Sequence, residues 1–93
     1  MSATACAAPD WRALGVEDGR LGRRATAYET RRAECGLAAT PDELAEDAYL
    51  SGHAEGVVIY CSRANGYKLG RAGATPTLSC PPHLEQEFAA GYA

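Results

Sequence analysis

The stretch that decides the fold runs from Thr40 to Cys61 and reads TPDELAEDAYLSGHAEGVVIYC. It begins with a capping hydroxyl at Thr40, a proline at the first helical position, and Glu43 where a capping box would close. Small and aromatic residues then recur every three or four positions, as one face of a helix requires: Ala45, Tyr49, Gly52, Gly56 and Tyr60. We therefore expect a helix from Pro41 to about Cys61, with a face on which tyrosines alternate with glycines.

The end of this helix has a competing interpretation. Val57-Val58-Ile59 is β-branched, and Asn65-Gly66 is a common hairpin turn. A small β-hairpin over residues 57–69 is therefore the alternative. From Asn65 to Pro82 the spaced glycines and prolines favour a loop.

The segment before Thr40 predicts one long helix. Asp10 offers a capping side chain ahead of Trp11, and Gly36 is a good left-handed helix terminator. The helix is expected to bend near three glycines, each of which costs roughly 1 kcal/mol relative to Ala inside a helix: Gly15, Gly19 and Gly22. Residues 1–9 are expected to form a flexible N-terminal segment.

A third helical segment follows the double proline Pro81-Pro82. Residues 83–90 carry Leu84 and Phe88 four positions apart, so both side chains can pack on the rest of the fold. The predicted fold is all-α. Residues 10–93 form a single small domain in which two main helices make a disulfide-stapled antiparallel hairpin, followed by a Gly/Pro-rich loop and this short C-terminal helix.

Four cysteines are spread over the 93 residues of the chain: Cys6, Cys35, Cys61 and Cys80. Such an even number in a small domain is typical of two disulfides, which require an oxidising compartment. In an antiparallel hairpin, the helix from Pro41 to Cys61 would span about 30 Å and keep Cys35 away from Cys61. On this hypothesis Cys6 pairs with Cys61 and Cys35 with Cys80, unless the glycines fold the first helix back.

The charge and the apolar runs exclude two classes of protein. The formal net charge is −3, whereas a nucleic-acid-binding domain normally carries a clear basic excess. The longest apolar run, residues 57–61, is far below the ~20 residues that span a membrane. Because the N-terminus shows no export leader, we expect either an exported protein whose leader was removed or a cytoplasmic protein with reduced thiols. The cysteine pattern favours the first.

No residue cluster forms a catalytic or cofactor signature. Among possible zinc ligands only Cys80 and His83 are close in sequence, whereas structural zinc sites usually contain two such pairs. His53 is expected at the surface or in a groove. Carboxylate pairs such as Glu17-Asp18 are typical of solvated helix faces. We therefore expect neither an enzyme nor a cofactor.

An aromatic residue precedes two spaced glycines three times: Trp11 with Gly15 and Gly19, Tyr49 with Gly52 and Gly56, and Tyr67 with Gly70 and Gly73. The favoured interpretation is that the glycines let helices approach closely. The alternative is a shallow aromatic groove for a ligand or peptide. Four large side chains are the first candidates for a binding surface, although they can equally form the core: Trp11, Tyr49, Tyr60 and Tyr67.

Several short motifs recur together over most of the chain: Asp10-Trp11, Gly15, Asp18-Gly19, Gly22, Cys35, Tyr49, Gly52, Gly56, Tyr60-Cys61, Asn65-Gly66-Tyr67, Gly70, Gly73, Cys80-Pro81 and Phe88. In this combination the chain resembles a bacterial family called domain of unknown function 2799, found largely in Gram-negative envelope proteins and often described as lipoproteins. The resemblance implies an extracytoplasmic domain with paired cysteines and brings no assigned activity. The chain departs from the family in lacking the leader and the lipid-attachment cysteine, in carrying His53 where arginine is common, in a longer stretch 36–48, and in lacking an aromatic residue in 74–79.

The expected function is that of a non-catalytic domain of the periplasm or outer envelope, which binds another protein or has a structural role. One alternative is an inhibitor or immunity-type protein that binds an envelope-acting toxin, because the chain is small and acidic with paired cysteines. The other alternative is a cytoplasmic metal-binding or thiol-redox protein. Attachment to a membrane is expected only through a lipid anchor that this chain does not contain.

Overall fold

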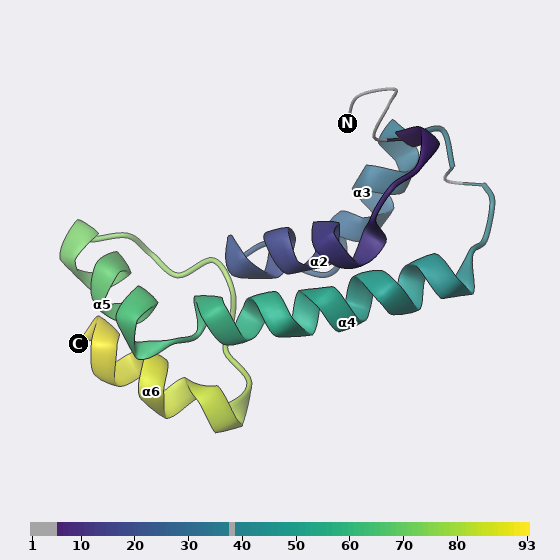
Figure 1. Ribbon diagram of the computed structural model, residues 1–93. Coiled ribbons are helices and arrows are strands. Elements are labelled where there is room, and N and C mark those ends of the chain that lie inside the picture. Colours follow the sequence, from purple (N-terminus) through teal and green to yellow (C-terminus); the bar gives the residue numbers. More distant parts are fainter. Residues whose placement is uncertain (1–5, 38) are drawn as a thin grey trace.

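The computed structural model describes residues 6–37 and 39–93, and over these residues the chain is helical with no strand. The helices follow in the order α2 (Trp11–Arg20), α3 (Ala27–Glu34), α4 (Glu43–Tyr60), α5 (Arg63–Ala72) and α6 (Pro82–Tyr92) (Figure 1). Two disulfides link parts of this arrangement. The predicted all-α, disulfide-stapled fold is confirmed.

Helix α4 forms where the sequence predicts it, but its cap is another residue. The carboxylate of Asp42 accepts a hydrogen bond from the backbone N–H of Ala45 at 3.0 Å. The prediction that Thr40 is the cap is wrong, because the backbone is still extended at Asp42 and the helix begins one residue later. A carboxylate at this position also interacts favourably with the positive end of the helix dipole. The C-terminal end at Tyr60 agrees with the prediction.

The chain from Ser62 onward forms α5 in place of the predicted hairpin or loop. The Ser62 hydroxyl caps the helix by accepting a hydrogen bond from the N–H of Asn65 at 3.1 Å. The Asn65 side chain donates to the carbonyl of Tyr60 at 2.7 Å, so it joins α5 to the end of α4 and forms no hairpin turn. Gly73, with φ of 66°, ends α5. The loop prediction holds only for the segment between α5 and α6.

The first predicted helix is divided into α2 and α3. Asp10 caps α2 as predicted, but the helix ends at Arg20 and Gly22 follows with φ of 78°. Residues with a Cβ rarely adopt this left-handed backbone conformation. A glycine at position 22 therefore allows the chain to reverse there. Helix α3 then returns along the molecule and is followed by Gly36, with φ of 70°. The prediction of one bent helix is wrong, although Gly22 is one of the three glycines at which a bend was expected.

Helices α2 and α4 pack side by side and run in the same direction (Figure 1). A Cβ atom added at Gly15 would meet the backbone of Tyr49 and His53, and one added at Gly19 would meet the backbone of His53 and Val57. The two helices therefore advance together and do not form the predicted antiparallel hairpin. The reason is the reversal at Gly22: since α3 carries the chain back, α4 starts beside the start of α2.

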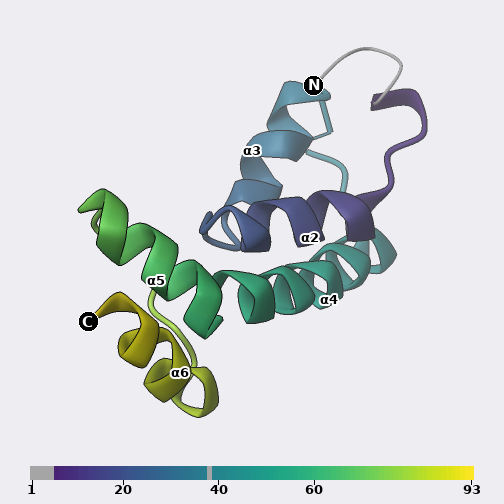
Figure 2. The same cartoon turned by 60° about the vertical axis from the view of Figure 1, so that its left-hand side comes forward.

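A second pair, α5 and α6, repeats this arrangement at the other end of the molecule (Figure 2). A Cβ at Gly66 would meet the carbonyl of Phe88, and one at Gly70 would meet the carbonyl of Tyr92. These helices also run in the same direction. The interpretation of the spaced glycines as sites of close helix approach thus agrees with both pairs. In α5 the glycines at the helix contact are Gly66 and Gly70, whereas a Cβ added at Gly73 would meet no atom within 4 Å.

The buried hydrophobic residues form two clusters, one at the start of α4 and one at its end. The first consists of Trp11, Tyr28, Ala45 and Tyr49. The second consists of Val57, Tyr60, Cys61 and Phe88, with Leu84 packed against it. The predicted C-terminal helix is confirmed as α6, and Leu84 and Phe88 anchor it as expected.

The disulfides join Cys6 to Cys35 and Cys61 to Cys80, with Cα–Cα distances of 5.4 and 5.8 Å. The predicted pairing of Cys6 with Cys61 and of Cys35 with Cys80 is wrong. It assumed an antiparallel hairpin, whereas α3 returns the chain so that Cys35 lies beside Cys6. The exception stated with the prediction, in which the glycines fold the first helix back, is the one that occurs.

Removal of the second bridge gives a first testable expectation. We expect the double variant Cys61→Ser/Cys80→Ser to lose about 3 kcal/mol of unfolding free energy, because the bridge closes a loop across 19 residues and restricts the unfolded chain. Urea denaturation of the oxidised wild type and the variant measures the loss. Peptide mapping without reductant checks the connectivity, and recovery of Cys6 joined to Cys61 would contradict the structure.

Candidate functional site

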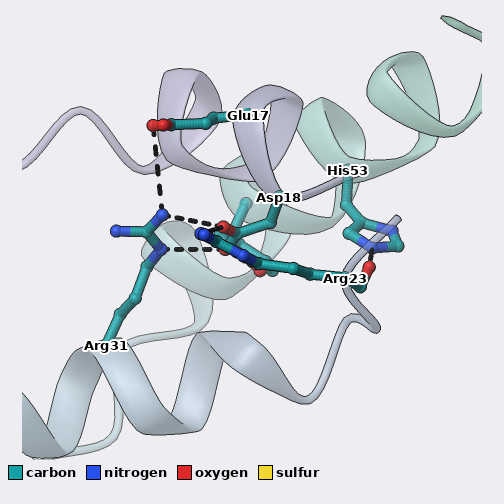
Figure 3. Close-up of polar contacts among 6 residues, drawn as sticks. Glu17, Asp18, Arg23, Arg31 and His53 are labelled. Atoms are coloured by element: carbon teal, nitrogen blue, oxygen red, sulfur yellow. Dashed lines mark hydrogen bonds and ion pairs between the residues drawn. The ribbon is translucent and has the colours of Figure 1, made fainter. Parts of the chain in front are cut away.

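The most concentrated polar cluster is built around Asp18, a fully buried residue of α2 (Figure 3). Arg31 of α3 donates two hydrogen bonds to its carboxylate, from Nε at 2.8 Å and from Nη2 at 2.7 Å. Arg23 donates a third at 3.0 Å, and the Tyr49 hydroxyl of α4 donates a fourth at 2.5 Å. We call Asp18, Arg23, Arg31 and Tyr49 the Asp18 cluster. It ties together α2, α3, α4 and the α2–α3 connection.

Sequence analysis placed Asp18 with Glu17 on a solvated face, and for Asp18 this is wrong. Glu17 is half exposed and reaches Arg31 only at 4.0 Å. A signal for burial was present in the sequence, because Asp18 continues the spacing of Trp11, Gly15 and Gly22 at steps of four, three and four. A buried carboxylate requires cationic or hydrogen-bonding partners, and the arginines of the following segment supply them.

The surroundings fix the protonation states of the cluster. Burial by itself would raise the pKa of Asp18, but hydrogen bonds from Arg31, Tyr49 and Arg23 and the charge of Arg31 outweigh it and lower the pKa to about 2. Burial and the hydrogen bond to Asp18 both raise the pKa of the Tyr49 hydroxyl above its ordinary value. At neutral pH the cluster therefore holds an ionised carboxylate and a protonated phenol.

This arrangement leaves little capacity for proton transfer or ligand binding at Asp18. An ionised carboxylate offers about four lone-pair sites. Four hydrogen bonds from the protein already occupy them. The chemistry of the Asp18 cluster is therefore that of a buried, hydrogen-bonded ion pair that holds three helices together.

His53 of α4 lies next to this cluster and is buried, whereas the sequence placed it at the surface or in a groove. Its Nε2 donates to the backbone carbonyl of Arg23 at 2.7 Å, so it fixes the connection that follows α2 (Figure 3). Its ring also stacks on Tyr49, with centroids 6.1 Å apart. His53 thus has hydrogen-bonding and packing roles in the fold.

The possible zinc ligands are not brought together. Cys80 is bonded to Cys61, so it offers no thiolate, and His83 lies exposed in the first turn of α6. The part of the chain that the structure describes contains no group of three or more histidine, cysteine, aspartate or glutamate residues that could hold a metal ion.

The four candidate binding residues separate into two kinds. Trp11, Tyr49 and Tyr60 are buried and belong to the core, which is the second interpretation that the sequence allowed. Trp11 and Tyr28 pack edge to face, and the guanidinium of Arg32 lies 6.0 and 5.6 Å from their ring centroids. Tyr67 is 56% exposed and is the one of the four that remains at the surface.

A group of exposed apolar side chains lies along α4, interspersed with the exposed polar residues Asp47, Ser51 and Glu55. Its large side chains are Leu44, Leu50, Val58 and Ile59, of which Leu44 is 83% and Val58 51% exposed. Exposed Ala54 lies between Leu50 and Val58 at helical steps of four. We call these five residues the outer α4 face. The outer α4 face was not predicted from the sequence, in which Val58 and Ile59 were considered only as part of the alternative β-hairpin over residues 57–69.

Two observations bear on location. Both disulfides indicate an oxidising, non-cytoplasmic compartment. None of the helices within residues 6–37 and 39–93 combines the length and the apolar character needed to cross a membrane.

Comparison with known protein families gives a match. The sequence profile of a family described as protein of unknown function (DUF2799) matches residues 10–93. No curated protein and no solved structure matches the chain significantly. The matched range covers all five helices α2 to α6. The chain therefore belongs to the DUF2799 family, as the resemblance in its motifs implied.

Proposed function

We propose that this protein is a non-catalytic domain of the periplasm or outer envelope that acts by binding another protein through the outer α4 face. The observation that carries the proposal is that α4 exposes several large apolar side chains in addition to the apolar face that it buries. Its inner side is used by α2 and the core, with Tyr49, Val57 and Tyr60 buried. Its outer side keeps Leu44 and Val58 in contact with solvent.

Contiguous exposed apolar surface on a small protein is typical of an interaction site, whereas single exposed apolar residues are ordinary. The outer α4 face contains a contiguous apolar surface, because Leu50, Ala54 and Val58 follow one another along one line of the helix. The two disulfides support an extracytoplasmic location for this protein. A partner that binds it there must be extracytoplasmic too.

Site-specific photocrosslinking in the source organism tests the proposal. A photoreactive residue at position 58 is expected to give a covalent adduct of discrete size with another protein. The same residue at position 29, where exposed Glu29 lies on α3, is the matched control and is expected to give none. The further substitution Ala54→Lys should abolish the adduct and change thermal unfolding little, since Ala54 is exposed and lysine is a good helix former. Equal crosslinking from both positions, or none from position 58, would contradict the proposal.

The compartment is tested separately on protein purified from the same cells. We expect no reactive thiol and a mass lower than that of the reduced chain by two hydrogens for each disulfide. Four reactive thiols would overturn the extracytoplasmic assignment and leave the crosslinking result to be explained in a reducing compartment.

A further inference from the structure

A second surface of different chemistry lies between α6 and the segment that precedes it. This groove has a volume of about 760 Å³. One wall is α6, with Glu85, Phe88 and Tyr92, and the other is the segment 76–80. Arg24, from the connection between α2 and α3, also lines it. We call it the α6 groove.

The segment 74–80, which contains this wall, is held in place from several sides. The backbone N–H of Thr77 donates to the Tyr60 hydroxyl at 3.0 Å, and the Thr77 hydroxyl donates to the carbonyl of Gly22 at 2.9 Å. The Tyr92 hydroxyl donates to the carbonyl of Ala74 at 2.8 Å. The disulfide of Cys80 to Cys61 fixes the end of the segment. The groove is therefore preformed, which lowers the entropy lost when a ligand binds.

The groove combines an apolar floor with two opposite charges. Phe88 is buried and stacks on Tyr92, with centroids 6.1 Å apart, and Leu78 and Ala89 extend the apolar area. Within the described residues neither Arg24 nor Glu85 forms an ion pair. One cation and one carboxylate are thus available at the same groove.

The wall also offers backbone groups. Among the described residues, the N–H and carbonyl groups of Leu78 and Ser79 make no backbone hydrogen bond. Backbone groups without a partner can bond to a bound peptide, in which case these bonds give affinity and side-chain pockets give specificity. A simple lipid anion would match Arg24 and the floor but would be repelled by Glu85.

We propose that the α6 groove binds a short extended peptide segment of a partner protein, with an apolar side chain over Phe88, an acidic side chain at Arg24 and a basic side chain at Glu85. This site is separate from the outer α4 face. Either proposal can therefore fail without the other.

Selection from a library of randomised heptapeptides on the oxidised protein tests this proposal. We expect enrichment of peptides that combine one acidic, one or more apolar and one basic residue in a fixed order. Selection on Arg24→Glu is expected to replace the acidic residue by a basic one, and selection on Glu85→Lys to replace the basic residue by an acidic one. Lys68→Glu, a charge reversal at an exposed residue of α5 outside the groove, should leave the selected pattern unchanged.

Fluorescence anisotropy with the most enriched peptide gives the magnitude. We expect Arg24→Glu to weaken binding about tenfold, since attraction is replaced by repulsion at a partly exposed site. Ala89→Trp should weaken it at least as much by filling the groove from an exposed helix position, with thermal unfolding unchanged. Three outcomes would overturn the proposal: no enrichment over the bare support, the same pattern on Arg24→Glu as on the wild type, or binding of laurate with no binding of peptides.

Discussion

The substitution Asp18→Asn is expected to destabilise the protein by about 4 kcal/mol at pH 7. Removal of one partner of a buried ion pair leaves an uncompensated charge, and such changes typically cost about 3 to 5 kcal/mol. Here the charge left behind is Arg31, whose side chain is only 15% exposed and which loses its counter-charge and one of the two oxygens that accept its hydrogen bonds. An asparagine retains one acceptor oxygen and places an amide group, itself a donor, against the donors of Arg31 or Tyr49. Denaturant unfolding of the oxidised variant measures the loss.

The neighbouring residue provides a matched control. Glu17→Gln removes the same charge one position away, but Glu17 is half exposed and 4.0 Å from Arg31. We expect it to change the unfolding free energy by less than about 0.5 kcal/mol, as is usual for surface substitutions. If Asp18→Asn is no more damaging than Glu17→Gln, the Asp18 cluster does not contribute to stability through its charge.

The pH dependence of the difference between wild type and Asp18→Asn identifies the cause. The folded state lowers the pKa of Asp18 from its ordinary value of 3.8 to about 2, so folding favours the ionised carboxylate. Its stabilising contribution is therefore complete above about pH 5 and is lost as the pH falls through the range from 4 to 2. The difference between the two unfolding free energies should therefore narrow by about 2 kcal/mol between pH 5 and pH 2. A difference that stays constant from pH 7 to pH 2 would assign the effect to packing.

The sequence predicted the helices more reliably than their connections. The stretch from Thr40 to Tyr60 has local signals for its start, its face and its end, and these do not depend on the rest of the chain. The cap was misplaced because Thr40 and Asp42 are both good capping residues, and only the extended backbone at Asp42 selects between them. Local signals therefore leave an uncertainty of a few residues at helix ends.

The topology depended on glycines whose role is not local. Gly22 and Gly19 are three positions apart, yet one reverses the chain and the other lies inside a helix against His53 and Val57. Because glycine occurs both in turns and at close helix contacts, Gly66 and Gly70 were also wrongly predicted to lie in a loop. Since the direction of α3 decides which cysteines meet, the misinterpretation of Gly22 also produced the wrong disulfide pairing.

The candidate site was less predictable, because burial and exposure depend on tertiary packing. Aspartate is usually found at the protein surface. Only the helical spacing of Asp18 relative to Trp11 and Gly15 indicates that it is buried. Valine is usually found in the core. Val58 is exposed because the opposite side of α4 packs against α2. Both the Asp18 cluster and the outer α4 face therefore became visible only when the helices were placed in space.

The packing of α2 on α4 predicts that the double substitution Gly52→Ala/Gly56→Ala destabilises the protein by about 4 kcal/mol. A Cβ at Gly52 would overlap the carbonyl oxygen of Arg12, and one at Gly56 would lie 2.6 Å from the backbone nitrogen of Arg20. Because these neighbours are backbone atoms, no change of rotamer relieves the overlap and the helices must separate. Overpacking of this kind typically costs about 1 to 3 kcal/mol per site.

The sign of this effect is what makes it informative. In an isolated helix, alanine is favoured over glycine by about 1 kcal/mol per position, so a chain without this helix contact would become more stable. Ser51→Ala, at an exposed position of the same helix, is the control and should be neutral or slightly stabilising. Fluorescence of Trp11, the only tryptophan and a core residue between these helices, follows the unfolding. If the double variant matches Ser51→Ala, α2 and α4 do not meet backbone to backbone. That result would contradict the parallel packing of α2 and α4, which brings Gly52 and Gly56 against the backbone of α2.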